Sequence, residues 1–237
     1  MKKFIALSLA AIIGFSVAQA QSKNYLSIEA GMSLSGMTKK ISDNMRTCGL
    51  GSDITWFFIL MPITDHYPKI STQSYNYRAR FGHHINERTA IEAGGGVSYQ
   101  ATITGAAANG ENANYLNIDV KFSTAYAAYM INNKKGNLAI GLGPTVTFCN
   151  IKQSSSSGEL SNKNYVLPGA IITGNWHFIN QKHWFMELRS DLTITAPAKT
   201  ESVTIINGVD KNFVTYSKST SFGAAMCSFS MGAGIKF

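Results

Sequence analysis

The residues best suited to chemistry lie in one unusual segment, TWFFILMPITDHYP, at positions 55–68. It carries Asp65 and His66, and Ser52 and Ser71 lie close to them in sequence. An acid, an imidazole and a hydroxyl are the groups that activate a serine for acyl transfer. The chain nevertheless has no Gly-x-Ser-x-Gly motif and no compact His/Ser signature. We therefore predict a protein without enzymatic activity, and an acyl-transfer enzyme stays as the alternative.

The same segment contains the longest apolar run after residue 20, from Ile54 to Ile63. Exposed apolar patches often mark contacts with a partner or a membrane. Trp56, Phe57 and Phe58 are therefore candidate contact residues in an adhesive surface, a helix lying on a membrane or a lid. Self-packing of a long loop is the alternative, and it assigns these side chains no function.

Charged residues fall on one face of the segments in which polar and apolar side chains alternate. When the more apolar parity of each segment is taken as one face, every charge lies on the other. That face is neutral, with five acidic and five basic residues. Since buried charges are tolerated only when paired, we predict an ion-paired lumen lined by Glu29, Arg78, Arg80, Glu92, Asp119, Lys121, Glu187, Arg189, Asp191 and Lys236.

Eight alternating segments must position these charges. One of them, YLNIDVKFSTAYAAYM, is far longer than the ~5–6 residues of an ordinary strand. Every second connection is short, HHINER, INNKKG or INQKH, whereas the others are long. Brief turns at one end and long loops at the other are typical of membrane barrels. The predicted strands are Tyr25–Ser35, Thr72–Gly82, Thr89–Ile103, Tyr115–Met130, Asn137–Phe148, Tyr165–Phe178, Trp184–Thr195 and Ser221–Phe237.

The fold class predicted is all-β, an eight-stranded antiparallel up-and-down transmembrane β-barrel with short periplasmic turns and long extracellular loops. Strands of this length suit a tilted membrane crossing of ~9–11 residues, and eight strands leave a lumen filled by side chains. We place lipid beside Leu116 and Ile118, and lumen beside Asp119 and Lys121. A soluble lipocalin-like barrel with the two faces exchanged is an alternative. Aromatic residues near the tight turns predict an interfacial girdle: Phe81, Tyr126, Trp176, Phe178, Trp184 and Phe237.

The first residues have the layout of a secretory signal peptide. Lys2 and Lys3 precede an apolar stretch, and Ala18 and Ala20 frame an A-x-A cleavage site. We expect a signal peptide over residues 1–20 and a single barrel domain over residues 21–237. The three cysteines lack metal-site spacing. They predict free thiols, with a Cys48–Cys149 bridge as the alternative and no cofactor or metal.

With this signal peptide, the eight-fold alternation and the terminal FSMGAGIKF, the chain resembles the small eight-stranded outer-membrane β-barrel family. This family includes the transmembrane domain of outer-membrane protein A. The resemblance implies a monomer in the outer membrane, in contact with lipids that include lipopolysaccharide. It also implies that the barrel-assembly machinery reads Phe237, and that a lipid A-modifying enzyme is one alternative activity.

A structural or adhesive role toward an unknown extracellular partner is the predicted function. A second alternative is an apolar-ligand carrier that opens sideways near Pro144 and Pro168, because proline cannot donate to a strand ladder. The basic residues show no Arg/Lys–aromatic pattern, so we expect no nucleic acid partner.

Overall fold

The fold is almost entirely β-structure. The computed structural model describes residues 23–51, 53–58, 61–73, 75–106, 115–206, 213–216 and 221–237. Its elements, in chain order, are β1 (Asn24–Ser35), α2 (Met37–Thr47), β2 (Asp53–Phe58), β3 (Met61–His66), β4 (Lys69–Gln73), β5 (Tyr75–Asn86), β6 (Thr89–Ala106), β7 (Tyr115–Asn132), β8 (Leu138–Ser155), β9 (Gly158–Asn180), β10 (Trp184–Lys199), β11 (Val203–Ile206), β12 (Phe213–Tyr216) and β13 (Ser221–Lys236).

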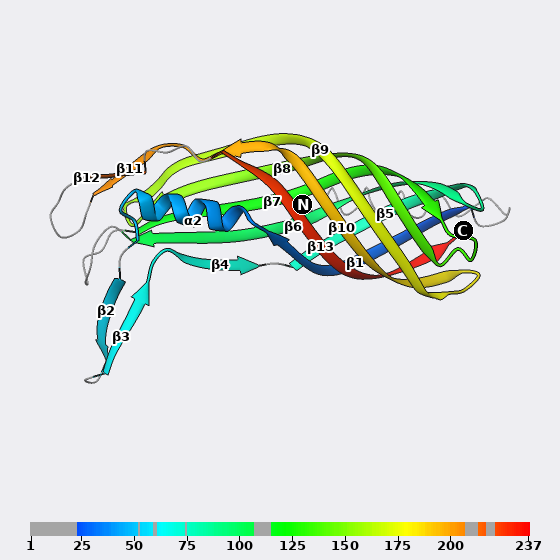
Figure 1. Cartoon of the computed structure of the whole chain (residues 1–237), viewed down its shortest axis with the longest axis horizontal. Coiled ribbons are helices and arrows are strands. Elements are labelled where there is room, and N and C mark those ends of the chain that lie inside the picture. The colour runs from blue at the N-terminus through cyan, green and yellow to red at the C-terminus, as the bar shows by residue number, and fades with distance from the viewer. Residues whose placement is uncertain are drawn as a thin grey trace.

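Eight strands form an antiparallel ring in the order β1-β5-β6-β7-β8-β9-β10-β13, and β13 pairs with β1 again. Neighbours in sequence are neighbours in the ring, as in an up-and-down barrel (Figure 1). The β4 strand adds to one edge of β6, and β2–β3 and β11–β12 are separate hairpins. The predicted eight-stranded antiparallel fold is confirmed.

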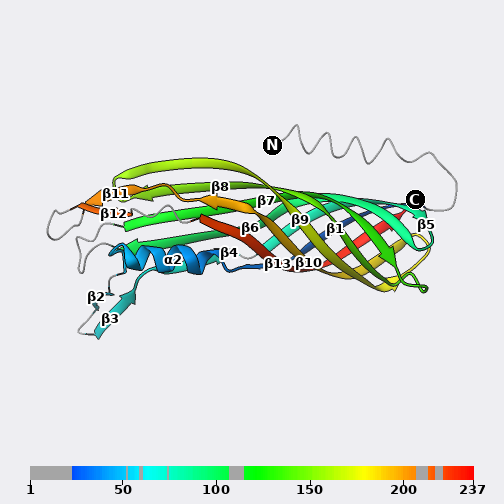
Figure 2. The same cartoon turned by 45° about the horizontal axis from the view of Figure 1, so that its top comes forward.

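The two ends of the barrel differ. At the turn end, on the right of Figure 1, β5–β6, β7–β8 and β9–β10 are joined by residues 87–88, 133–137 and 181–183. At the loop end lie α2, β4 and the two hairpins (Figures 1 and 2). Within the described residues, none of the helical structure has the length and apolar character of a membrane-crossing helix.

The strands reach farther toward the loop end than the sequence predicted. Residues 149–164, expected to form a loop, instead extend β8 and β9 as a ladder from Cys149↔Tyr165 to Ser155↔Gly158. Their alternation continues, with Ile151 and Gln153 buried between partly exposed polar residues. The serine-rich stretch therefore contributes only a tight turn, at which Gly158 has a φ of +130°.

The α2 helix was not predicted from the sequence. Met37, Ile41 and Met45 recur at a spacing of four residues and form its buried stripe, whereas Lys40 is exposed. The helix ends where Gly49 takes a φ of +80°, a conformation that glycine adopts without strain. One amphipathic helix thus lies inside what the sequence presents as a long loop.

Candidate functional site

Seven of the ten predicted lumen charges meet in one buried cluster in the turn-end half of the barrel. Arg78 Nη1 lies 2.6 Å from Asp191 Oδ2, and its Nε lies 3.6 Å from Glu29 Oε1. Arg189 Nε lies 2.8 Å from Asp191 Oδ1. Strands β1, β5, β6 and β10 supply the cluster, which we call the ionic cluster: Glu29, Arg78, Arg80, Glu92, Glu187, Arg189 and Asp191.

Glu92 is the centre of this cluster. It pairs with Arg80 and with Arg189, whose Nη1 lies 2.5 Å from Glu92 Oε1. Tyr25 and Tyr126 each donate a hydroxyl hydrogen bond of 2.8 Å to the same carboxylate. All four donors are buried, so the Glu92 charge is compensated without water.

His177, which was not predicted from the sequence, contributes to the balance of charge in the cluster. The cluster holds four carboxylates and three guanidiniums. His177 Nε2 lies 3.2 Å from Glu187 Oε2, and Arg80 pairs with the same carboxylate. Charge counting within strands could not reveal the contribution of His177, Tyr25 or Tyr126, because none of them is a formal charge at neutral pH.

Hydroxyl and amide groups occupy the next layer of the lumen. Ser98 donates to Thr124 at 2.7 Å, and Asn76 donates to Ser33 at 3.0 Å. Ser230 connects this layer to the ionic cluster through a 2.7 Å hydrogen bond to Glu29. Ser98 is an extra residue in β6, because the register shifts between Val97 and Tyr99.

An apolar core fills the loop-end half. Tyr99, Val120 and Phe122 are almost fully buried there, and the apolar stripe of α2 packs against them. The outer face at the same level is polar: Asn150 donates hydrogen bonds to Asn162 at 2.8 Å and to Asn164 at 2.9 Å. Along β7, β8 and β9, this half therefore has an apolar interior and a mainly polar exterior.

Three predicted lumen residues lie elsewhere. Lys121 is exposed and Asp119 is half-buried on the outer side of β7, where Thr102 donates to the Asp119 carboxylate. Leu116 and Ile118, which the sequence predicts to face lipid, are fully buried inside. The placement of these β7 residues was wrong because the apolar face of this strand borders the apolar core. Lys236 lies at the turn end, where its Nζ donates to the Gln181 carbonyl at 3.0 Å.

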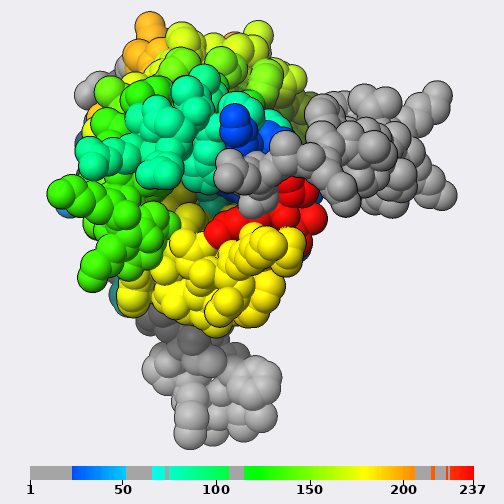
Figure 3. All heavy atoms as spheres, turned by 90° about the vertical axis from the view of Figure 1, so that its right-hand side faces the viewer, coloured from blue at the N-terminus to red at the C-terminus, as the bar shows by residue number. Residues whose placement is uncertain are grey.

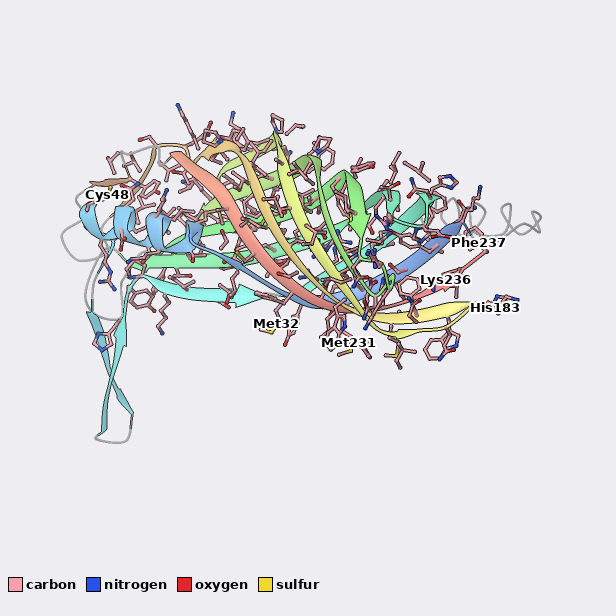
Figure 4. All side chains as sticks on the ribbon, turned by 45° about the vertical axis from the view of Figure 1, so that its right-hand side comes forward. Met32, Cys48, His183, Met231, Lys236 and Phe237 are labelled. Atoms are coloured by element: carbon pink, nitrogen blue, oxygen red, sulfur yellow. The ribbon has the colours of Figure 1, made fainter. Side chains whose placement is uncertain are left out.

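The exterior of the turn-end half is apolar. Met32 and Met231 point away from the barrel wall (Figure 4) and are more than half exposed, at 54% and 53%. Trp176, Phe178, Trp184 and Phe81 are exposed near the turns, as an interfacial girdle requires. Tyr126 does not belong to this girdle, because it faces the ionic cluster.

The segment with the predicted chemistry forms the β2–β3 hairpin and its continuation. Trp56 stands opposite Ile63 and Phe58 opposite Met61, which places these four on one face of the hairpin. Phe57 pairs with Pro62 on the other face.

The candidate acyl-transfer residues stay unassembled in what the structure describes. His66 ends β3 in register with Asp53 and is exposed, and Ser71 is exposed on β4. Ser52 lies outside the described residues, as does the side chain of Asp65.

The proline-containing wall stays in register. Pro144 pairs with Ala170 across β8–β9. The β7–β8 ladder is interrupted at Gly143 and Pro144, between Tyr126↔Thr145 and Tyr129↔Leu142, and continues in the same register on both sides. The β9–β10 ladder, in contrast, ends at Thr195↔Gly169, next to Pro168.

Beyond that point the β9–β10 seam is bridged by side chains. Tyr165 donates to the Lys199 carbonyl at 2.6 Å, Ser161 donates to the Glu201 carboxylate at 2.6 Å, and Lys163 Nζ lies 3.2 Å from Glu201. The Ser161 hydrogen bond, followed by that of Lys163, lowers the pKa of Glu201.

Phe237 and the three cysteines complete the predicted positions. Phe237 exchanges two backbone hydrogen bonds with Asn24, of 2.9 and 3.0 Å. Cys48, Cys149 and Cys227 are free thiols. In the described part of the chain, no group of three or more His, Cys, Asp or Glu side chains is arranged to hold a metal ion.

Comparison with known proteins gives likeness of architecture only. No family model matches the chain, and no curated protein does. Among solved structures, the attachment invasion locus protein Ail of Yersinia pestis has 9% identity, with 92% of this chain and 100% of that chain covered, at a TM-score of 0.44. The outer membrane protein OprG of Pseudomonas aeruginosa has 10% identity, with 93% and 99% covered, at a TM-score of 0.44.

The outer membrane protein AlkL, solved in lipid bilayers, has 12% identity over 94% of each chain, at a TM-score of 0.43. All three are similar to this chain in fold alone. The strand pairings of the chain itself carry the assignment. It is an eight-stranded, antiparallel, up-and-down β-barrel.

Proposed function

We propose that the chain is an outer-membrane β-barrel whose loop end faces the cell exterior and acts in surface contacts. One observation carries this proposal: in the turn-end half, ionic side chains are buried inside and apolar side chains are exposed outside. If this outer surface faced water, a large apolar belt would be exposed to solvent. A bilayer would cover the belt, while the ring of strands pairs the backbone groups that hydrocarbon cannot satisfy.

The lumen supports a structural role rather than that of a wide pore. The ionic cluster, the hydroxyl layer and the apolar core follow one another along the barrel, and each consists of buried side chains. A solute crossing the barrel would have to displace paired charges and a packed core. We therefore assign the specificity of the protein to its loop end.

The topology can be tested with single cysteines on intact cells, in a background with Cys48, Cys149 and Cys227 replaced. Ser157→Cys lies in the β8–β9 turn at the loop end, and Lys135→Cys in the β7–β8 turn at the turn end. A membrane-impermeant maleimide is expected to label only Ser157→Cys until the cells are broken. Equal labelling of both, or extraction of the protein without detergent, contradicts the proposal and favours a soluble barrel.

We assign the surface contact to the β2–β3 hairpin. It extends away from the barrel at the loop end (Figures 1 and 2), and its register gathers Trp56, Phe58, Ile63 and Met61 on one face. An apolar arm of this kind suits contact with another apolar surface.

The contact role is tested by replacing Trp56, Phe57 and Phe58 with serine. Adherence of cells that display the protein is expected to fall, with unchanged amounts in the membrane. Thr55→Ser with Thr64→Ser, a cross-strand pair of the same hairpin, is the control. Unchanged adherence of the triple variant contradicts a role for the hairpin.

A further inference from the structure

The turn end carries a set of basic side chains that the barrel itself does not use. Lys134 and Lys135 lie in the β7–β8 turn, Lys182 in the β9–β10 turn, Arg88 in the β5–β6 turn and Lys23 just before β1. We call these five residues the basic collar. The three turns carry one acidic residue, Glu87, so the collar leaves a net positive charge.

The collar residues belong to one continuous rim. Backbone hydrogen bonds join neighbouring corners: Asn132 to Arg88 at 2.7 Å, His84 to Lys23 at 2.7 Å, and Lys236 to His183 at 2.9 Å. The Asn180 side chain donates to the Gly136 carbonyl at 3.1 Å and joins the remaining two turns. Figure 3 looks onto this end, with the β7–β8 turn in green, the β9–β10 turn in yellow and the C-terminus in red.

The collar charges are uncompensated within the described part of the chain. None of the five side chains there has a carboxylate oxygen within 4 Å, whereas Lys152 at the loop end lies 2.8 Å from Glu159 and Lys163 lies 3.2 Å from Glu201. Exposed, unpaired cations concentrated on one rim favour an anionic partner outside the protein.

The position of the collar relative to the aromatic girdle indicates which anionic partner it meets. Lys182 precedes the exposed Trp184 by two residues, and exposed Trp176 and Phe178 lie on the adjoining strand. Aromatic girdles mark the boundary between acyl chains and headgroups, so charges one or two residues beyond them lie at headgroup level. Apolar Leu138 and Ile91 likewise begin the belt just beyond Lys135 and Arg88.

We propose that the basic collar binds the phosphate headgroups of anionic phospholipids in the leaflet at the turn end. This inference rests on the proposed membrane location of the barrel. A basic side chain near an anionic surface favours association roughly five-fold. With one collar side chain for each headgroup, we expect an anionic lipid to be enriched about five-fold over a zwitterionic lipid beside the girdle.

Tryptophan fluorescence reports on this end of the barrel. The chain has three tryptophans, and Trp56→Phe leaves only Trp176 and Trp184, both in the girdle. The full chain with this substitution is reconstituted into vesicles that contain either brominated phosphatidylglycerol or brominated phosphatidylcholine. Quenching by each lipid gives their relative binding constant at the girdle.

The collar variant combines Arg88→Gln, Lys134→Gln, Lys135→Gln and Lys182→Gln. Its matched control removes four charges at the loop end through Lys39→Gln, Lys40→Gln, Arg46→Gln and Lys69→Gln. The preference for phosphatidylglycerol is expected to fall from about five-fold to about one in the collar variant and in high salt. The control is expected to keep the preference.

The other outcomes distinguish failure of the membrane proposal from failure of the collar proposal. If brominated phosphatidylcholine does not quench either, the chain does not enter bilayers, and the membrane proposal fails together with the collar. If quenching shows insertion but no preference for phosphatidylglycerol, or if the collar variant keeps the preference, only the collar proposal is overturned. Binding to isolated peptidoglycan that is lost in the collar variant, without any lipid preference, replaces the phospholipid with a wall polymer.

Discussion

The two halves of the barrel are built in opposite senses. In the turn-end half, buried Arg80 and Glu92 face inward and exposed Met231 faces outward. In the loop-end half, buried Phe122 faces inward and exposed Lys121 faces outward. The strand β7 runs through both halves with one unbroken alternation. The same backbone therefore carries two opposite arrangements of polar and apolar side chains.

The largest expected effect comes from removing the centre of the ionic cluster. Glu92→Ala leaves Arg80 and Arg189 without their shared counterion, and breaking a buried pair costs about 3–5 kcal/mol of unfolding free energy. Urea unfolding in lipid vesicles measures the change. The control Glu159→Ala removes an exposed carboxylate of the loop-end half and is expected to leave the unfolding midpoint unchanged. Similar midpoints for both variants would show that the cluster contributes nothing.

A charge on the outer belt gives the next largest effect. Met231→Lys places an ammonium on the exposed face of β13, and a lysine on the lipid face costs about 2–4 kcal/mol at the bilayer midplane. The loss is measured by unfolding in vesicles. Asn150→Lys, on the outer face of the loop-end half, is expected to have little effect. Equal losses at the two positions contradict the division of the exterior into lipid and water.

Removal of an apolar contact of α2 should be smaller. Ile41→Ala leaves a cavity in the loop-end core, and such truncations cost about 2–5 kcal/mol. We expect the low end, because the helix lies at the edge of the core and can shift. Amide hydrogen exchange in α2 and in the loop-end part of β7 should become faster, while the amides of the turn-end half keep their protection. Lys40→Ala on the exposed face is the control, and global loss of protection in Ile41→Ala would show that the halves do not unfold separately.

The smallest expected effect is a pH dependence of the β9–β10 seam. The folded-state pKa of Glu201 is lowered, mainly by the Ser161 hydrogen bond. Its contribution is therefore complete above the unfolded pKa and is lost as the pH falls through the folded pKa. Amide exchange around residues 199–202 should accelerate in acid relative to neutral pH, after correction for intrinsic rates. Glu201→Gln should remove this difference, and an unchanged difference would mean that another group controls the seam.

Much of the fold followed from alternation alone, because a half-buried strand needs a period of two whichever face is wet. The same period of two explains why some residues were assigned to the wrong face of the barrel wall. In β7, Leu116 and Ile118 are as apolar as a lipid-facing set, yet they belong to the loop-end core. In β6, the extra residue Ser98 exchanges odd and even positions partway along the strand. No single parity describes a strand with these features.

The members of the ionic cluster on β5 and β10 could be predicted from the sequence. Arg78 with Arg80, and Glu187, Arg189 and Asp191, alternate with residues whose side chains are exposed on the apolar exterior. The aromatic donors and the α2 helix were missed for another reason. Tyr126 contributes through a hydroxyl that is indistinguishable in sequence from a girdle aromatic, and α2 is an 11-residue helix whose polar face resembles a loop.

The pairing of β1 with β13 bears on the order in which the protein is made. Ser230 reaches Glu29 across 201 positions of sequence, so the last strand of the ring completes contacts begun by the first. Pairings this distant in sequence form slowly. Until β13 pairs, β1 and β10 are open edges of the sheet, and their unpaired backbone groups can pair with another chain instead.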